Sequence, residues 1–551
     1  MKSKKILPLV LAAAMCFALA GCTSAQRNST DIKSSDGDIA KDAEEKVVTL
    51  AESWDFASGI APALNPSVSP NYGSIYWSRN FYNTLVSYND KGEIVGELAE
   101  DWEISDDGKR YTFHLREGVK FSDGTDLTAE AVKVSFEAAV FNLGMYNGSY
   151  GMLSALFDSI EVVDKHTVVI NLIQPYYNTL NDLTMSCPLA IANPVAFEGA
   201  EDLTYGAPFQ TASFGTGPYM YTGDFTNNTY TFIRNPYYWG EAPEADAFKV
   251  KVIEDNDAKL LALRNGEIDG ILGSSRISFD GYSELSSDAS FNTGMNERAS
   301  LTRYLGMNVT TAPFDDIRVR QAVAYAIDQS ALEASVFNGL ETAAETLFPK
   351  SAPYCDVELT TYATDFDKAK ELLKQAGWAD SNGDGIVEKD GIPFEVDLNY
   401  MTSLASIDNA ALAIAGQLAQ IGIKVNVISG DMMTYYAAMS TSPLLLANTY
   451  GGAFDPSAVV TNMNPAVSTD PLSMQYVNFF EEGILDELNA TADMNRVQEI
   501  YKHVLTTIAD QALLVPLTRS HEVGIWSSTA VAGYDFYIDP SYTVISQIHI
   551  K

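Results

Sequence analysis

The first 30 residues constrain this chain most, because they decide the compartment in which the rest of it folds. Three lysines, at positions 2, 4 and 5, precede an apolar run over residues 6–20, and Gly21 and Cys22 follow it. A basic start, a short apolar stretch and a small-residue cleavage site are typical of a secretory signal. The run is shorter than the ~20 residues that a transmembrane helix needs. We therefore expect residues 1–21 to be a signal peptide and the mature protein to be exported.

Cys22 directly follows two small residues, Ala20 and Gly21, and this arrangement resembles the lipobox of bacterial lipoproteins. The resemblance implies cleavage before Cys22 and lipid on its thiol and new amine; the alternative is an ordinary signal peptide with an incidental cysteine. Residues 23–46 hold no aromatic and few aliphatic side chains, so they cannot bury enough apolar surface to order themselves. We expect residues 22–46 to be a lipidated, flexible tether. It would hold the protein extracytoplasmically, on the outer face of the cell membrane or on the periplasmic side.

The length and charge of the remainder limit the function classes. Residues 47–551 are too many for one hydrophobic core and predict two or three domains. Acidic residues number 72 against 35 basic ones, a formal net charge of −37. Such a field repels phosphate backbones, so we expect no nucleic acid as a partner. We interpret the acidity as a solvated surface rather than as a trap for cations.

The four cysteines predict little covalent cross-linking. Cys16 leaves with the signal peptide, and Cys22 would take lipid. Cys187 and Cys355 then remain, far apart and without metal-type spacing. A disulfide between them is possible in an exported protein, but two buried thiols are the favoured interpretation.

Local patterns predict several elements. Residues 46–53 alternate like a first strand, and aromatic side chains over residues 75–86 recur with helical spacing. Residues 102–104 and 111–115, joined by the turn Asp106-Asp107-Gly108-Lys109, predict a hairpin. Thr128 is a candidate N-cap for a helix with Val132, Phe136 and Val140 on one face.

A second predicted helix lies near residues 317–327. Val319, Ala322, Val323, Ala326 and Ile327 form one apolar stripe and are expected in the core. Arg318 and Arg320 flank that stripe, and we expect them at the surface or in ion pairs.

Five blocks of sequence follow one another in an order and spacing typical of one protein family. They are residues 96–139, FGTGPY at 214–219 with RNPYYWG at 234–240, LLALRNGEID at 260–269, FDDIRVRQAVAYAID at 314–328, and AKELLKQAGW at 369–378. Together they resemble the extracellular solute-binding receptors of ATP-driven peptide and nickel importers (solute-binding protein family 5). The resemblance is strongest to the nickel and dipeptide-receptor branch.

This resemblance implies an α/β, bilobed periplasmic-binding-protein-like fold of type II, in the three-domain peptide-receptor class with mixed sheets. Lobe I would take residues 47–77, 190–300 and 521–551; an inserted subdomain residues 78–189; and lobe II residues 301–520. The implied function is that of a substrate-binding lipoprotein of an ABC importer. It would capture a short peptide or related small solute between its lobes and, as a monomer, deliver it to the permease and ATPase subunits. The alternatives are a receptor for nickel or another metal chelate, and a peptide-sensing receptor without transport.

The residues themselves give no catalytic constellation. None of the five histidines has a second histidine within two to five positions, and neither a G-x-S-x-G elbow nor a phosphate-binding G-x-x-x-x-G-K loop occurs. Acidic pairs are abundant, but nothing in the sequence marks one as catalytic. We expect no enzyme, no cofactor and no resident metal.

One loop nevertheless has an alternative as a calcium site. Residues 380–386, DSNGDGI, copy the first half of an EF-hand loop, but Gly391 stands where its bidentate glutamate belongs. A hairpin turn before a strand at residues 394–398 is favoured, and a weak calcium site stays open.

The ligand-binding residues are inferred from the resemblance. In dipeptide receptors an aspartate before an Asp-Pro pair holds the peptide amine, and here Gly452 or a close neighbour stands there; the arginine and histidine contacts of nickel receptors are missing too. The remaining candidates are aromatic and polar, with Arg79 and Asp455 as charge partners, although Asp455 before Pro456 could equally be a turn or helix cap. The candidates are Trp54, Tyr76, Trp77, Arg79, Tyr436 with its neighbour Tyr435, Tyr450, Asp455 and Thr543.

Overall fold

A computed structural model describes residues 45–56, 59–62, 72–144, 147–148, 151–402, 406–449, 456–468 and 470–551. Residues 45–551 form one compact unit. The predicted signal peptide, Cys22 and most of the tether lie outside the described residues, as do Tyr450 and Asp455. Within the described part of the chain, no helix is both long and apolar enough to cross a membrane.

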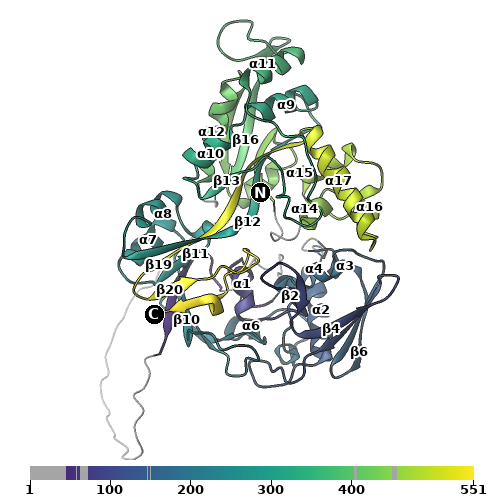
Figure 1. The fold of residues 1–551 in the computed structure, drawn as a ribbon, viewed down its shortest axis with the longest axis vertical. Coiled ribbons are helices and arrows are strands. Elements are labelled where there is room, and N and C mark those ends of the chain that lie inside the picture. The colour runs from purple at the N-terminus through teal and green to yellow at the C-terminus, as the bar shows by residue number, and fades with distance from the viewer. Residues whose placement is uncertain are drawn as a thin grey trace, which may run out of the picture. The chain divides into compact units, whose positions relative to one another are not determined.

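A mixed sheet forms the frame of this unit (Figure 1). Its strands lie in the order β17-β16-β18-β12-β19-β11-β1-β10-β9-β8, and β13 pairs with β19 beside this path. Their bounds are β1 (Val47–Glu52), β8 (Tyr219–Thr226), β9 (Thr229–Arg234), β10 (Ala247–Val252), β11 (Gly270–Leu272), β12 (Phe291–Met307), β13 (Glu341–Ala343), β16 (Glu395–Met401), β17 (Lys424–Gly430), β18 (Leu444–Asn448) and β19 (Leu514–Ser527).

The two long strands β12 and β19 join the two halves of this sheet. At one end, residues 291–295 of β12 pair with residues 523–527 of β19, which in turn pairs with β11. At the other end, residues 303–306 of β12 pair with residues 514–518 of β19, and β12 also pairs with β18. The register shifts between Met295 and Leu301, so the ladder is irregular where one half passes into the other. This arrangement matches the expected bilobed fold with mixed sheets.

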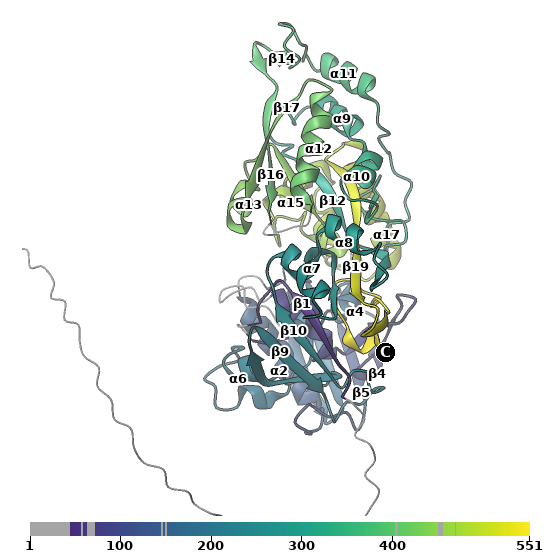
Figure 2. The ribbon, with the colours of Figure 1, turned by 90° about the vertical axis from the view of Figure 1, so that its left-hand side faces the viewer.

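Helices cover the half that contains β16, β17 and β18. Helix α12 packs on β16 and β17, as Figure 2 shows, and α9 packs on both α11 and α12. The helices and 3₁₀ turns of this half are α9 (Ile317–Ala326), α10 (Gln329–Ser335), α11 (Phe366–Gln375), α12 (Ile407–Ala419), α13 (Met432–Ala438), α14 (Ser457–Thr461), α15 (Pro471–Met474), η5 (Gln475–Phe479), α16 (Ile484–Leu488) and α17 (Met494–Asp510). A short hairpin, β14 (Glu388–Lys389) and β15 (Ile392–Pro393), belongs to the same stretch of chain.

The other half carries shorter helices and the ends of the described chain. Its elements are α1 (Tyr72–Trp77), η1 (Ser78–Asn80), η3 (Pro194–Phe197), α6 (Pro208–Thr211), α7 (Asn256–Arg264), η4 (Ser274–Arg276), α8 (Phe279–Leu285), β20 (Val531–Tyr534), η6 (Ile545–Gln547) and β21 (Ile548–Ile550). Strand β1 lies between β10 and β11, so the start of the described chain is in the sheet interior.

Residues 86–189 contain a separate four-stranded antiparallel sheet with its own core, together with a two-stranded sheet of β2 and β3. The strand order is β4-β5-β7-β6, and α2 packs on β6 and β7. The elements are β2 (Val86–Tyr88), β3 (Ile94–Gly96), β4 (Ala99–Ile104), β5 (Arg110–Leu115), α2 (Ala129–Leu143), α3 (Leu153–Leu156), β6 (Phe157–Asp164), β7 (Thr167–Leu172), α4 (Thr179–Asp182) and α5 (Ser186–Leu189). The apolar side chains of this region form a buried cluster around Phe113, Val132 and Phe136.

Most predicted elements are confirmed. The first strand is β1, the hairpin is β4–β5, and Thr128 caps α2 with its side chain accepting from Ala131 N. Cys187 and Cys355 are both buried and are not joined in a disulfide. Two expectations are wrong in part. The helical pattern at residues 75–86 ends at Asn80, and β2 begins at Val86.

Arg320 is the second correction, because it is neither exposed nor ion-paired within the described residues. Its side chain is 1% exposed and donates to the backbone oxygens of Phe314 and Gln511. Arg318, in contrast, is exposed and pairs with Asp316 at 2.6 Å, as expected. A buried guanidinium needs acceptors, and backbone carbonyls at chain turns supply them here.

Candidate functional site

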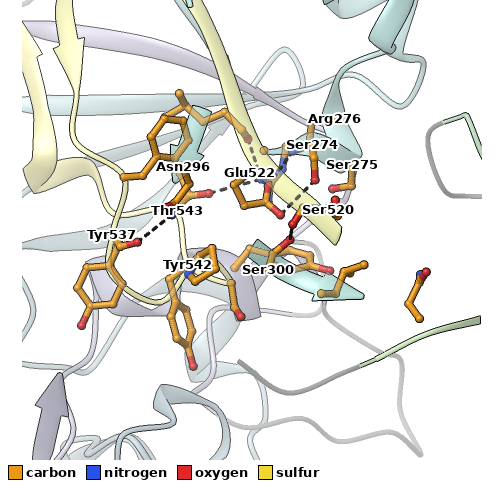
Figure 3. A pocket seen from close by; sticks show the side chains of 18 of the residues that line it. Ser274, Ser275, Arg276, Asn296, Ser300, Ser520, Glu522, Tyr537, Tyr542 and Thr543 are labelled. Atoms are coloured by element: carbon orange, nitrogen blue, oxygen red, sulfur yellow. Dashed lines mark hydrogen bonds between the residues drawn. The ribbon is translucent and has the colours of Figure 1, made fainter. Parts of the chain in front are cut away.

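A cavity of about 270 Å³ lies against the irregular stretch of β12 and β19 (Figure 3). Small-molecule pockets typically measure roughly 300–1,000 Å³, so this volume lies just below that range. Its walls come from β12 and β19, from the β11–η4 turn, from the C-terminal segment 534–543 and from Tyr76. The lining residues are Tyr76, Leu272, Gly273, Ser274, Ser275, Arg276, Asn296, Ser300, Leu301, Arg303, Asn448, Thr449, Ser520, Glu522, Tyr534, Phe536, Tyr537, Pro540, Ser541, Tyr542 and Thr543.

A buried ion pair stands behind one wall of the cavity. The Arg276 Nε lies 2.6 Å from Glu52 Oε2, and the side chains are 4% and 0% exposed. Trp77 Nε1 also donates to Glu52 Oε2, at 2.8 Å. The guanidinium carbon of Arg276 lies 5.0 Å from the centroid of the Tyr76 ring. The carboxylate at the end of β1 therefore fixes the arginine that reaches the cavity.

The β11–η4 turn is shaped by Gly273. Its φ is +113°, and a Cβ built there would lie 2.0 Å from Arg276 Nη1. Only glycine adopts this backbone readily and leaves room for the guanidinium. The next residue, Ser274, donates its backbone N to Glu522 Oε2 at 2.7 Å and its hydroxyl to Glu522 Oε1 at 3.1 Å. The turn thus positions one arginine and one carboxylate beside each other.

A second buried ion pair links β12 to β13, which pairs with β19. Arg303 of β12 lies 2.7 Å from Glu341 of β13, and the side chains are 6% and 0% exposed. Thr518 Oγ1 also donates to Glu341, at 2.5 Å. Arg303 lines the cavity, but its charge is already balanced by Glu341.

The C-terminal segment is held against α1 and η1 by one backbone hydrogen bond and by the side chain of Asn80. Thr543 N donates to Tyr76 O at 2.8 Å, and Asn80 Nδ2 donates to Thr543 O at 2.7 Å. Asn80 Oδ1 accepts from Ile545 N at 2.8 Å. These bonds hold in place the aromatic wall of the cavity, which consists of Tyr534, Phe536, Tyr537 and Tyr542. The residues of this wall lie more than 450 positions from Asn80 in sequence.

The aromatic wall supplies neutral hydrogen-bonding groups. Burial raises the pKa of Tyr534 and of Tyr537 to about 12. Both phenols therefore stay protonated at neutral pH. With Phe536 and Tyr542 they give a surface that can pack against apolar groups and accept cations on ring faces.

The structure brings two of the predicted ligand-binding residues, Tyr76 and Thr543, to this cavity. Trp77 and Arg79 are buried behind it. Trp77 stacks on Phe248 with ring centroids 5.8 Å apart, and Arg79 pairs with Glu97 at 3.1 Å. Trp54 is 38% exposed.

The other described candidates, Tyr435 and Tyr436, lie in α13. Tyr436 is 55% exposed, whereas its neighbour Tyr435 is buried and donates to Leu446 O at 3.1 Å. Neither side chain is part of the cavity lining. Tyr450 and Asp455 lie outside the described residues.

Sequence reasoning missed Arg276, Asn296 and Glu522 at this site. One signal was available for the first of them. Glu52 ends an otherwise apolar strand, and a buried carboxylate requires a cationic or hydrogen-bonding partner. Nothing in the local sequence around residues 274–276 or 520–522 indicates that these segments meet.

The loop with the calcium-like motif forms a turn. Asp380 accepts from Gly383 N and Gly385 N, and Ala379 bridges to Glu388. Carboxylate oxygens of Asp380, Asp384 and Glu388 lie within 4.8 Å of one another, with the two aspartates exposed. The favoured turn is confirmed.

Residues 93–469 match the model for the bacterial extracellular solute-binding proteins, family 5. The nickel-binding periplasmic protein of Escherichia coli is 29% identical over 463 residues, covering 83% of this chain and 86% of that protein. A Brucella ovis protein, named as a putative ABC transporter peptide-binding protein, is 30% identical over 406 residues, with 71% and 72% covered.

Solved structures show the same fold. NikA from Brucella suis, in complex with Fe(III)-EDTA, superposes with a TM-score of 0.82 at 30% identity and covers 92% of this chain and 100% of that one. The oligopeptide-binding protein AppA from Bacillus subtilis, in complex with a nonapeptide, gives a TM-score of 0.72 at 20% identity, with 92% and 99% covered.

Proposed function

Because the chain belongs to the bacterial extracellular solute-binding proteins of family 5, we propose that it captures a short peptide or a related small solute in the cavity beside β12 and β19 and delivers it to the permease of an ABC importer. The observation that supports a peptide ligand is the chemical character of the residues that line the cavity. Aromatic side chains, hydroxyl groups and one carboxylate converge there with two arginines that are already paired to Glu52 and Glu341, which suits amide groups and a short apolar side chain.

A metal chelate is the second candidate, favoured by the likeness to nickel-binding relatives. The described lining contains no histidine and no cysteine. Those are the side chains that bind nickel through imidazole and thiolate groups, so a bound metal would have to bring its own organic ligands. This makes the peptide the better-supported proposal.

Mass spectrometry of the ligand that co-purifies with the protein tests this proposal. Short peptides released from the denatured protein are the expected result. Nickel in a one-to-one ratio without peptide would contradict it, and submicromolar binding of nickel with histidine by calorimetry would favour the chelate.

Measurements of peptide uptake distinguish a transport function from a sensing function. Cells that lack the protein should lose uptake of the identified peptide, and the wild-type gene should restore it. Unchanged uptake together with a lost transcriptional response would favour the sensing alternative. We also propose that the protein converts nothing, so a peptide incubated with it should be recovered with unchanged mass.

The predicted anchor belongs to the same proposal. We expect the mature protein to partition into detergent and to carry diacylglycerol on Cys22. Cys22→Ala should leave it soluble or unprocessed. Recovery of the unlipidated wild-type protein from the culture medium would contradict the anchor without affecting ligand binding.

A further inference from the structure

We propose that Glu522 is the group that binds the protonated amine of the ligand. This inference rests on the proposed peptide function and names the part of the peptide that the cavity recognises. The charged residues of the cavity wall support this assignment. Of the described residues that line the cavity, Arg276, Arg303 and Glu522 are charged, so Glu522 is the sole carboxylate among them.

The positive charges of the two arginines are already neutralised by buried carboxylates of the protein. Arg276 pairs with Glu52 and Arg303 with Glu341, each through a carboxylate that is 0% exposed. Glu522, in contrast, forms no ion pair with any residue that the structure describes. The wall therefore presents at Glu522 a carboxylate that has no cationic partner within ion-pair distance among the described residues.

The position of this carboxylate is fixed. Two hydrogen bonds from Ser274 hold its oxygens, one from the backbone and one from the hydroxyl (Figure 3). A carboxylate can accept about four hydrogen bonds, so capacity is left on both oxygens. Both donors are neutral. A ligand ammonium would provide an ion pair, in which donor and acceptor are both charged, and the serine cannot provide that.

A neighbouring group can bind an acceptor on the same ligand. Arg276 Nη2 is buried and has no hydrogen-bond partner among the described residues. A buried, unsatisfied donor is costly. Because this nitrogen has no accessible surface, a carbonyl oxygen of the ligand would satisfy it only after a small movement of the surrounding wall. An ammonium with a carbonyl two bonds away is the amino terminus of a peptide. The pair Glu522 and Arg276 matches that arrangement in charge and in donor type.

The test uses the purified mature protein after unfolding, removal of bound ligand and refolding. Two probes are offered: an equimolar pool of synthetic tri- to pentapeptides with free amines, and the same pool acetylated at the amino terminus. Retained peptides are counted by mass spectrometry. The wild-type protein should retain free-amine peptides over acetylated ones by roughly thirtyfold or more, the effect of losing one desolvated charge contact.

Glu522→Gln keeps the size of the side chain and should abolish this preference. Glu482→Gln, an exposed glutamate outside the cavity, is the matched control and should keep it. Equal retention of both pools by the wild-type protein would overturn the role of Glu522 while leaving peptide binding intact. Retention of neither pool would overturn the peptide function itself. The comparison of two probes on the wild-type protein stands even if the variant fails to fold.

Discussion

Lys259 places an amine in the interior close to the Glu52–Arg276 pair. Its side chain is fully buried, and its Nζ donates to Ser53 Oγ at 2.5 Å and to Asn256 Oδ1 at 2.7 Å. Burial lowers the pKa of Lys259 to about 8, against 10.5 for an ordinary lysine, although the charge of Glu52 opposes this shift. The folded protein therefore releases this proton at a lower pH than the unfolded chain does.

This shift predicts how stability depends on pH. Between pH 8 and about 10, the unfolded chain binds more protons at Lys259 than the folded one, so the free energy of unfolding should rise with pH. The slope should approach about 1.4 kcal/mol per pH unit. Denaturant unfolding at several pH values measures it. Lys259→Met should flatten the slope, and an equal slope in that variant would show that another group is responsible.

Gly273 is the second residue with a measurable consequence. Gly273→Ala should destabilise the protein by about 1–3 kcal/mol and weaken ligand binding, because φ is +113° and the new Cβ would displace Arg276. Gly416→Ala, in α12 with no atom within 4 Å of the added Cβ, is the control and should be neutral or slightly stabilising. Similar unfolding curves for the two variants would contradict the prediction.

The limits of sequence-based prediction are visible at these residues. Thr128, the β4–β5 hairpin and the apolar stripe of α9 depend on local patterns, and all were predicted. Tyr76 and Thr543 were proposed through resemblance, and both line the cavity. Glu522 and Ser274 lie 248 positions apart and meet only through the pairing of β11 with β19. No spacing rule reports such a contact, so the position of Glu522 beside the 274–276 turn could not be predicted.

At the scale of elements, the C-terminal segment depends on η1 for its position. Asn80 is fully buried and binds the backbone at Trp77, Thr543 and Ile545. Residues 543 and 545 lie outside any strand. The Asn80 side chain gives their backbone one hydrogen-bond donor and one acceptor, as a neighbouring strand would.

Asn80→Ala should release that segment. The amides of Thr543 and Ile545 should exchange hydrogen faster, and the free energy of unfolding should fall by about 2–3 kcal/mol as buried backbone groups lose their partners. Hydrogen exchange with mass spectrometry resolves the peptide concerned. Asn426→Ala, on the outer strand β17, serves as control, since its side chain binds only exposed or half-buried carboxylates. Unchanged exchange over residues 540–547 would refute this role.

For the whole molecule, the excess of 72 acidic over 35 basic residues is the dominant electrostatic fact. Much of it is not paired, and like charges at the surface raise the free energy of the folded state. Salt screens such repulsion over a Debye length of about 10 Å at 0.1 M.

The melting temperature should therefore rise by roughly 1–3 °C between 20 and 200 mM sodium chloride. Sucrose at equal osmolality separates screening from solute exclusion. Calcium chloride at matched ionic strength shows whether the acidic loop at residues 380–388 adds a specific effect. A melting temperature that falls with sodium chloride would mean that the ion pairs, and not the net charge, dominate.

The passage of the paired strands β12 and β19 from one half of the sheet to the other has a consequence for protein engineering. Both strands continue through the two halves of the sheet, and their irregular middle carries Asn296, Ser300, Arg303, Ser520 and Glu522 into the cavity wall. A chimaera with its junctions at residues 300 and 520 would take half of that wall from each parent. Transfer of ligand preference from one parent to the other would then require four segments together: the middle parts of β12 and β19, the 273–276 turn and the C-terminal segment.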